Sequence, residues 1–516
     1  MEKIKILWAD DEIALLKPHI LFLDSKGYEV VPALSGDEAI DIVREDHSIS
    51  AVLLDENMPG ISGLETLLKI KQANGDLPVI MITKSEEEHI MDDAIGGKIA
   101  DYLIKPVNPN QILLSLKKAL DNRRLVSEKT NTDYRKEFGQ IGMTINDNLS
   151  WREWAEVYKK IIYWELEMDQ LHDKSMYDVL RMQKSDANNQ FCKFIQKNYI
   201  SWLNGKNPDP PVMSHTLIKN KFIQEMDEPV FFILIDNLRF DQWKIIQPLL
   251  LDYYKVETEE TFFSILPTAT QYSRNSIFSG LLPAEIEKRY PDFWLNDEEE
   301  GGKNLHEEAL MQAQLKRLGK DVKMSYTKIT NFNAGRKLAD NLSNLLQNKL
   351  NIIVYNFVDM LSHARTEMEV IRELAENEPA YRGITYSWFE HSPLFDIIKQ
   401  LADKKIKIVI ATDHGTVHVK EPTKILGDRN VNTNLRYKQG KALEYNPKEV
   451  FEIKNPSDAY LPVQHPSSRF VFALEDHFFA YPNNFNHYVN YYRNTFQHGG
   501  VSLEEMIIPY IVLTAK

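Results

Sequence analysis

Pro229-Val-Phe-Phe-Ile-Leu-Ile-Asp236 is a nearly continuous apolar run that ends in a carboxylate. A strand of this composition is buried on both faces, as in a parallel sheet that helices cover. Residues 352–357 and 406–411 are similar runs, and acidic residues follow both of them. The carboxyl ends of parallel strands meet at one edge of a sheet. The sequence therefore predicts an α/β domain with three aspartates gathered at one sheet edge.

Histidines accompany these aspartates at short spacing. His363 follows Asp359 by four residues, His414 directly follows Asp413, and His498 lies far downstream. Carboxylate and imidazole are both good zinc ligands, so three aspartates and three histidines suit two Zn²⁺-like ions. The six candidate ligands are Asp236, Asp359, His363, Asp413, His414 and His498.

One hydroxyl group is well placed for chemistry beside this set. Thr270 lies in the stretch 267–280, which has the pattern of a loop that opens a helix. Backbone N–H groups at a helix N-terminus face an anion favourably. A threonine hydroxyl is a poor nucleophile near neutral pH, but coordination to a divalent metal lowers its pKa. We expect Thr270 to be the nucleophile.

These residues resemble those of the alkaline phosphatase superfamily, and most closely its PglZ branch, in Ile235-Asp236-Asn237-Leu238-Arg239 and His498-Gly499-Gly500 through Glu504-Glu505. The resemblance covers roughly residues 215–516 and implies a metal-dependent phosphoesterase with an α/β sandwich fold. It implies one zinc site formed by Asp236, Thr270, Asp413 and His414, and a second formed by Asp359, His363 and His498.

The resemblance favours a phosphodiesterase, because monoesterases of this superfamily need further positive groups on the terminal phosphate oxygens. Arg274 follows Thr270 by four residues and is a candidate substrate contact, with a surface ion pair as the alternative. Asn275 is a second candidate, although related diesterases carry their asparagine at the position of Ser273.

The first ~120 residues form another α/β region, in which short apolar runs alternate with amphipathic stretches. We expect strands at 4–9, 51–54, 78–83 and 101–104, a helix over 11–25 and a closing helix over 110–124. Asp10 and Asp11 follow the first of these strands, Asp55 a later one and Lys105 the last. Three clustered carboxylates favour a cation such as Mg²⁺, which oxygen ligands bind. Asp55 could then accept a phosphoryl group.

The stretch Leu54-Asp-Glu-Asn-Met-Pro-Gly60 resembles the phosphoacceptor loop of response-regulator receiver domains, and Asp10-Asp11 resembles their metal-binding pair. The resemblance implies a flavodoxin-like fold and phosphorylation of Asp55 by a sensor histidine kinase. It implies Mg²⁺ ligands at Asp10, Asp11, Asp55 and Asn57, and switch residues at Thr83, Tyr102 and Lys105.

Between these regions the strand signal vanishes, and aromatic residues such as Trp154 and Phe191 recur at helical spacing. A helix-bundle core explains this periodicity better than a ligand box, and we expect Cys192 to be a buried member of that core. A receiver domain (1–122), a helical bundle (123–210) and a PglZ domain (211–516) together resemble PorX-type response regulators. That resemblance implies a role in the type IX secretion system of Bacteroidetes.

Composition narrows the choice of function. The 516 residues include one cysteine and carry a net charge of −14, and no apolar stretch is long enough to cross a bilayer. These features and the absence of a secretory signal predict a cytoplasmic protein without membrane insertion. Sequence-specific DNA binding is not expected, because the charge is adverse and no helix-turn-helix pattern stands out.

Two functions of different classes remain open. The first is a phosphorylation-controlled zinc phosphodiesterase for nucleotides or oligonucleotides, which dimerises on phosphorylation through the face near Tyr102. Basic and aromatic residues in the insertion 418–490, among them Arg436 and Lys438, suit a nucleotide strand, with a solvated capping loop as the alternative. The second function is a non-enzymatic adaptor that docks on a sigma factor or a secretion-machine component and has a structural metal site. The presence of Thr270 favours the catalytic function, because a structural metal site has no need of a nucleophile.

Overall fold

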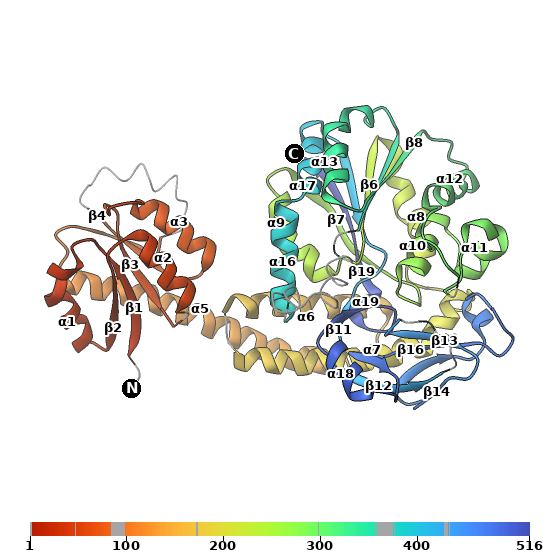
Figure 1. The fold of residues 1–516 in the computed structure, drawn as a ribbon, viewed down its shortest axis with the longest axis horizontal. Helices are drawn as coiled ribbons and strands as arrows, with labels where there is room; N and C mark the ends of the chain where they lie inside the picture. The colour runs from red at the N-terminus through yellow and green to blue at the C-terminus, as the bar shows by residue number, and fades with distance from the viewer. Residues whose placement is uncertain are drawn as a thin grey trace. The chain divides into compact units, whose positions relative to one another are not determined.

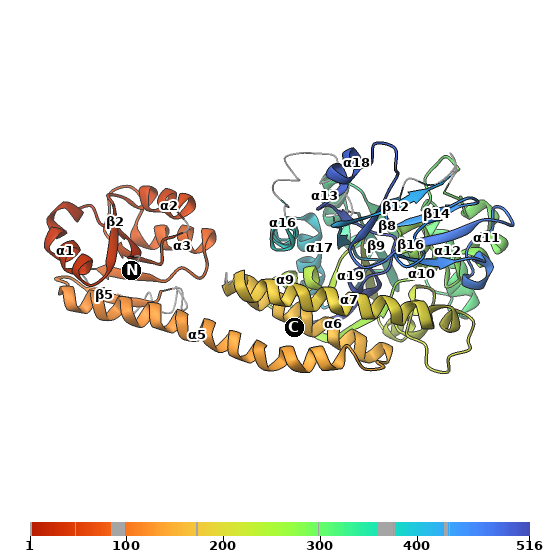
Figure 2. The same ribbon diagram turned by 90° about the horizontal axis from the view of Figure 1, so that it is seen from below.

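A computed structural model describes residues 3–46, 48–83, 99–171, 174–297, 299–356, 358, 375, 377–427, 432 and 434–516. Within these ranges, the side chains of residues 121–132, 135 and 170–175 are not described. The chain forms two compact units (Figures 1 and 2). One comprises Met1–Glu137 with Gln170–His172, and the other comprises Phe138–Asp169 with Asp173–Lys516.

The first unit contains a parallel sheet with the strand order β2-β1-β3-β4-β5. Helices α2 and α3 pack against one face and α1 and α5 against the other, so the sheet has an apolar core on each side. This is the predicted flavodoxin-like arrangement. Its elements are β1 Ile4–Ala9, α1 Lys17–Ser25, β2 Tyr28–Ala33, α2 Gly36–Glu45, β3 Ala51–Asp55, α3 Gly63–Ala73, β4 Val79–Thr83, β5 Asp101–Ile104 and α5 Pro109–Thr144.

Two helices differ from the sequence-based expectation. The helix expected over 11–25 starts as a 3₁₀ turn at Ile13–Leu16, and α1 follows with Pro18 in its first turn, where proline is tolerated. The closing helix does not end near 124: α5 continues to Thr144. Residues 125–138 contain neither glycine nor proline, so no local signal ends the helix there.

The second unit is built on a six-stranded sheet with the order β7-β19-β10-β6-β9-β8. The strands β10, β6, β9 and β8 are parallel to one another. At one side, β19 pairs antiparallel with both β10 and the edge strand β7, so β19 alone runs against the other five. Strands β6, β9 and β10 correspond to the three apolar runs of the sequence. The bounds are β6 Val230–Ile235, β7 Tyr254–Phe263, β8 Met324–Ile329, β9 Leu350–Tyr355, β10 Lys407–Ala411 and β19 Ile507–Ala515.

Helices cover both faces of this sheet. In Figure 1, α9, α16 and α17 lie on one side, and α8, α10 and α12 lie on the other. The helices are α8 Leu217–Asn220, α9 Phe240–Leu250, α10 Thr270–Ser279, α11 Pro283–Arg289, α12 Glu307–Arg317, α13 Phe332–Asp340, α16 Glu378–Glu390, α17 Pro393–Asp403 and α19 Leu503–Met506.

Two long helices, α6 (Trp151–Leu171) and α7 (Lys174–Leu203), run side by side (Figure 2). Their aromatic residues pack on one another, with the rings of Trp154 and Phe191 5.6 Å apart, and Phe263 of β7 joins the same cluster. Cys192 is buried beside them. The predicted bundle core is therefore confirmed, and it extends onto the large sheet.

The insertion 418–490 is more ordered than the solvated loop that the sequence left open. It contains small sheets and a helix with apolar cores of their own. These elements and two short flanking strands are β11 Val417–His418, β12 Glu421–Leu426, β13 Tyr437–Gly440, β14 Glu444–Tyr445, β15 Val450–Ile453, β16 Arg469–Ala473, β17 His477–Ala480, α18 Phe485–Tyr492 and β18 Phe496–Gln497. Within the described residues, no helix is long and apolar enough to cross a membrane.

Candidate active sites

The first site lies at the carboxyl edge of the small sheet, where β1, β3 and β5 end. The side chains of Asp10, Asp11 and Asp55 bring one carboxylate oxygen each to within 4.8 Å of the others. Lys105 places Nζ 3.0 Å from both Asp10 and Asp55. Three carboxylates and one ammonium group leave excess negative charge, which fits a divalent cation held by oxygen ligands.

Asp55 is the last residue of β3 and is buried. Burial raises the pKa of its carboxyl, and this outweighs the opposing effect of Lys105. Thr83 ends the neighbouring strand β4, and Tyr102 lies partly buried in β5. The structure thus places these residues on adjacent strands. Asn57 lies exposed in the loop after β3.

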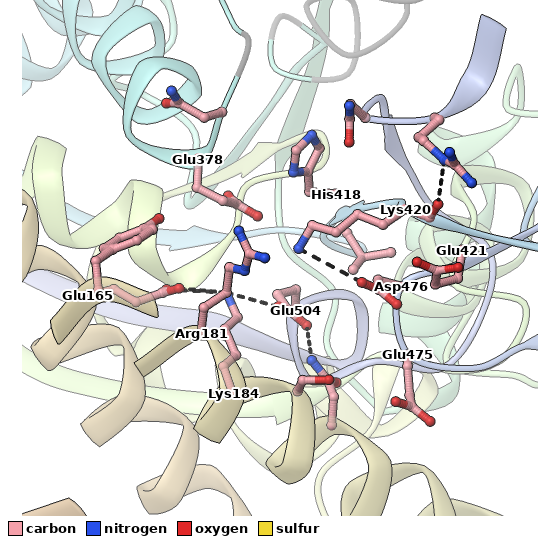
Figure 3. A pocket seen from close by; sticks show the side chains of 17 residues that line it. Glu165, Arg181, Lys184, Glu378, His418, Lys420, Glu421, Glu475, Asp476 and Glu504 are labelled. Atoms are coloured by element: carbon pink, nitrogen blue, oxygen red, sulfur yellow. Dashed lines mark hydrogen bonds and ion pairs between the residues drawn. The ribbon is translucent and has the colours of Figure 1, made fainter. Parts of the chain in front are cut away.

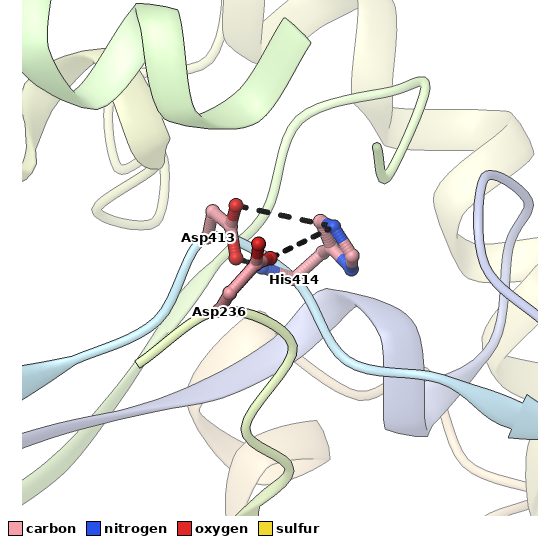
Figure 4. A group of neighbouring side chains, drawn as sticks. All are labelled: Asp236, Asp413 and His414. Carbon is pink, nitrogen blue, oxygen red and sulfur yellow. Dashed lines mark hydrogen bonds and ion pairs between the residues drawn. The ribbon is translucent and has the colours of Figure 1, made fainter. Parts of the chain in front are cut away.

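The second site lies at the carboxyl edge of the large sheet. Asp236 directly follows β6, and Asp413 and His414 follow the adjacent parallel strand β10. All three side chains are buried and point toward one another, with ligand atoms within 4.8 Å (Figure 4). The backbone N–H of Asn237 donates to Asp413 at 3.2 Å and ties the two loops together.

Thr270 is the first residue of α10 and is partly exposed. Its Oγ1 lies 3.1 Å from Nε2 of His414. Nδ1 of His414 faces the carbonyl oxygen of Gly415 at 3.1 Å, which favours a proton on Nδ1. Nε2 then carries the lone pair, so the threonine hydroxyl donates to it.

His498 joins the site from the loop after β18. Its ring stacks on that of His414, with centroids 4.2 Å apart and planes inclined by 18°. Its Nδ1 lies 3.0 Å from the carbonyl oxygen of Thr268, so the lone pair is again assigned to Nε2. This is the tautomer that metal-binding histidines use when a carbonyl oxygen orients the ring.

Arg274 forms an ion pair inside the protein, not at the surface as the alternative interpretation held. The guanidinium is fully buried and contacts Asp236, Asp413 and Glu307. Burial by itself would raise the pKa of Asp413, but the charge of Arg274 and the hydrogen bond from the backbone of Asn237 lower it below its usual value. A direct contact between Arg274 and the substrate stays a prediction.

The two polar residues beside Arg274 bind other parts of the protein. The amide nitrogen of Asn275 donates to the carbonyl oxygen of Lys303 at 3.1 Å, and its oxygen accepts from Asn304 at 3.0 Å. The hydroxyl of Ser273 lies 2.7 Å from that of Ser264. Both side chains therefore contribute to packing around the start of α10.

The donor set around His414 fits a metal of the zinc type, because buried carboxylates and a neutral imidazole converge on one point. Asp236, Asp413, His414 and Thr270 are brought together as the sequence predicted. Asp359 and His363, the remaining predicted ligands, lie outside the described residues.

Two buried residues of the site were missed by sequence reasoning. Glu307 begins α12 and receives contacts from Arg274 and, at 3.0 Å, from Lys328. Thr412 accepts a hydrogen bond from the backbone of Leu238 at 3.0 Å. No local pattern marks these residues, because their partners are far away in the sequence.

Two of the basic residues proposed for nucleotide binding are not available at the surface. Arg436 is fully buried and pairs with Glu505 at 2.6 Å. Lys438 is also buried, and its Nζ donates to the carbonyl oxygen of Asn432 at 2.7 Å. The charge of Arg436 is balanced by Glu505, whereas burial lowers the pKa of Lys438 to about 7.

Family models match the chain in three successive segments. A response regulator receiver domain matches residues 6–117, and a PorX response regulator linker domain matches 124–203. The BREX system PglZ alkaline phosphatase-like domain matches 216–513, which is more than half of the chain.

Curated relatives match over part of their length. The transcriptional regulatory protein ZraR of Klebsiella oxytoca is 33% identical over 141 residues, or 27% of this chain and 32% of that protein. The uncharacterized transcriptional regulatory protein YkoG of Bacillus subtilis is 34% identical over 134 residues, or 26% of this chain and 58% of that protein. The chain thus spans about a third of the length of ZraR.

Among solved structures, a response regulator receiver domain protein from Clostridium thermocellum is similar, with 31% identity and a TM-score of 0.22, covering 23% of this chain and 97% of that one. The order of receiver, linker and PglZ segments is that of a PorX-type response regulator. The chain therefore belongs to the PglZ alkaline phosphatase-like family, as a response regulator of the PorX type.

Proposed function

We propose that this response regulator is a zinc-dependent phosphodiesterase that acts on nucleotides or oligonucleotides, with Thr270 as nucleophile. One observation carries the proposal: the Thr270 hydroxyl lies 3.1 Å from Nε2 of His414, beside two buried aspartates and at the N-terminus of a ten-residue helix. A purely structural metal site has no need of a nucleophile in that place.

Asp236, Asp413, His414 and Thr270 would hold one zinc ion, and His498 would contribute to a second with Asp359 and His363. Bound zinc would lower the pKa of the hydroxyl and stabilise the leaving oxygen. The Thr270 hydroxyl gives up its proton, its oxygen attacks phosphorus, the P–O bond to the leaving alkoxide breaks, and the alkoxide takes up a proton in turn. Water then hydrolyses the phosphothreonine ester and restores the hydroxyl.

The surroundings of Arg274 support a diester substrate. Its guanidinium is fully buried against Asp236 and Asp413, so its charge orients these carboxylates and is not offered to the terminal oxygens of a monoester. A diester has one negative charge fewer on its non-bridging oxygens and needs less positive charge around them.

The receiver site supports control by phosphorylation. We propose that Asp55 accepts the phosphoryl group from a sensor histidine kinase, with Mg²⁺ held by Asp10, Asp11, Asp55 and Asn57. Thr83, Tyr102 and Lys105 would respond to the added charge of roughly −1.5 to −2. In response, the protein would dimerise. It would regulate type IX secretion from its location in the cytoplasm.

The test compares hydrolysis of bis-p-nitrophenyl phosphate by the zinc-loaded wild type and Thr270→Ala. We expect turnover to fall by several orders of magnitude, while the zinc content measured by mass spectrometry is retained. Thr416→Ala is the matched control, because this buried hydroxyl has no hydrogen-bond partner among the described residues. Equal turnover in Thr270→Ala would overturn the proposal.

An inactive zinc-loaded wild type would instead favour the second function, an adaptor that docks on a sigma factor or secretion component.

A further inference from the structure

One face of α7, in the linker, carries a row of polar side chains. Lys184, Asn188 and Cys192 are spaced by four residues and therefore lie on the same side of the helix. All three are buried, and all three face the segment between β18 and β19 that begins with the candidate metal ligand His498. A buried polar row is unusual in a bundle core, and its hydrogen-bond partners explain it.

Lys184 bridges the linker and the second α/β domain. Its Nζ lies 3.0 Å from Glu165 of α6 and 3.0 Å from Glu504 of α19 (Figure 3). Burial would raise the pKa of Glu504, but Lys184 and Asn188 lower it below its usual value. The glutamate is therefore charged, and its position depends on α7.

Asn188 contacts the same segment twice. Its Oδ1 accepts from the backbone N–H of Leu503 at 2.8 Å, and its Nδ2 donates to Glu504 at 3.0 Å. One turn further on, the thiol of Cys192 donates to the carbonyl oxygen of Val501 at 3.2 Å. The helix thus fixes backbone groups within five residues of His498.

The same helix also holds the segment that leads to Thr270. The hydroxyl of Tyr199 accepts a hydrogen bond from the backbone N–H of Leu266 at 2.8 Å, four residues before the nucleophile. Tyr199 is buried, so this N–H would lose its partner if the hydroxyl were removed.

We propose that α7 is a positioning element of the phosphodiesterase site, in which Asn188 sets the His498 segment and Tyr199 sets the Thr270 segment. One rigid helix then determines how far the nucleophile lies from the histidine pair. A shift of α7 displaces both segments together, so the state of the linker controls catalysis. This inference rests on the proposed function for its catalytic consequence, but not for the contacts themselves.

The test uses the full chain and two single variants with matched controls. Asn188→Ala removes the contacts to Leu503 and Glu504, whereas Asn198→Ala in the same helix removes a bond to its own helix, the carbonyl oxygen of Phe194. Tyr199→Phe removes the bond to Leu266. Tyr158→Phe, in α6, removes a buried hydroxyl that has no hydrogen-bond partner in the described part of the chain.

Amide hydrogen exchange is the first measurement. Asn188→Ala should accelerate exchange at least tenfold in 499–506, and Tyr199→Phe should do so in 265–270, with each control within twofold of the wild type. The second measurement is hydrolysis of bis-p-nitrophenyl phosphate, where both variants should lower kcat at least tenfold with KM unchanged. A merely structural role would leave kcat unchanged in the folded fraction.

Unchanged exchange in these segments would overturn the inference, and so would faster exchange with full kcat. If the wild type shows no hydrolysis, the proposed function fails separately. The zinc dissociation constant then replaces kcat: a tenfold rise in Asn188→Ala, but not in Asn198→Ala, supports positioning of His498, and an unchanged constant overturns it.

Discussion

Nε and Nη2 of Arg274 both lie 2.9 Å from Oδ2 of Asp413, although both side chains are fully buried. Asp236 contacts the same guanidinium, so one cation pairs with two carboxylates that are candidate zinc ligands. Burial would lower the pKa of Arg274, but the three carboxylates around it raise the pKa well above its usual value. The arginine is therefore a permanent positive charge behind the candidate zinc site.

Removing this charge should destabilise the metal-free protein. Arg274→Met leaves two carboxylates buried without their cation, and breaking a buried ion pair costs about 3–5 kcal/mol. We expect a loss of this size in the free energy of unfolding, measured by urea titration with a chelator present. Added zinc should recover more stability in the variant than in the wild type, because the metal ion supplies the missing positive charge.

Arg152→Met is the control for that experiment, because Arg152 pairs with Asp209 at the surface and little change is expected. Equal stability of both variants would show that Arg274 does not hold the site together.

Phosphorylation of the receiver should depend on a single carboxylate. Asp55→Asn should abolish the labelling of the chain by acetyl phosphate, because an amide oxygen is not a nucleophile for this reaction. Asp24→Asn, which changes an aspartate paired with Lys3 at the surface, should label like the wild type. Labelling of Asp55→Asn at the wild-type level would refute the assignment.

Phosphorylation should also change the oligomeric state. Treatment with acetyl phosphate should double the mass measured by light scattering, and Asp55→Asn should keep the untreated mass. The physical reason is the charge added beside Thr83 and Tyr102, which would reorder that face of the receiver. A wild-type mass that stays at its untreated value despite full labelling would exclude this route of control.

Acid should weaken the second unit through His215. Burial lowers the pKa of this imidazole to about 4. The unfolded chain binds the proton near pH 6.5, so the folded state loses stability as the pH falls from about 6.5 to about 4, at up to ~1.4 kcal/mol per pH unit. His215→Phe should flatten this slope in urea titrations between pH 4 and 7.

His391→Phe is the matched control, because His391 is exposed, and it should keep the wild-type slope. A slope in His215→Phe equal to that of the wild type would contradict the expected role of burial.

Local sequence signals were enough to identify the two α/β regions and the residues at their sheet edges. Asp55, Asp236 and Asp413 were identifiable because apolar runs mark buried strands, and the residues that end parallel strands gather at one edge of the sheet. The helical middle region was identifiable for a similar reason, since its aromatic residues recur with the period of a helix. These are local signals.

The contacts that join distant parts of the chain could be found only in the three-dimensional structure. Arg274 had the sequence context of a surface helix residue, and its burial against Asp236 and Asp413 depends on how α10 packs on the sheet. Asn188 and Leu503 are 315 residues apart, and no sequence pattern near either residue predicts their hydrogen bond. Such contacts depend on the packing of whole elements, whereas periodicity records only which face of each element is buried.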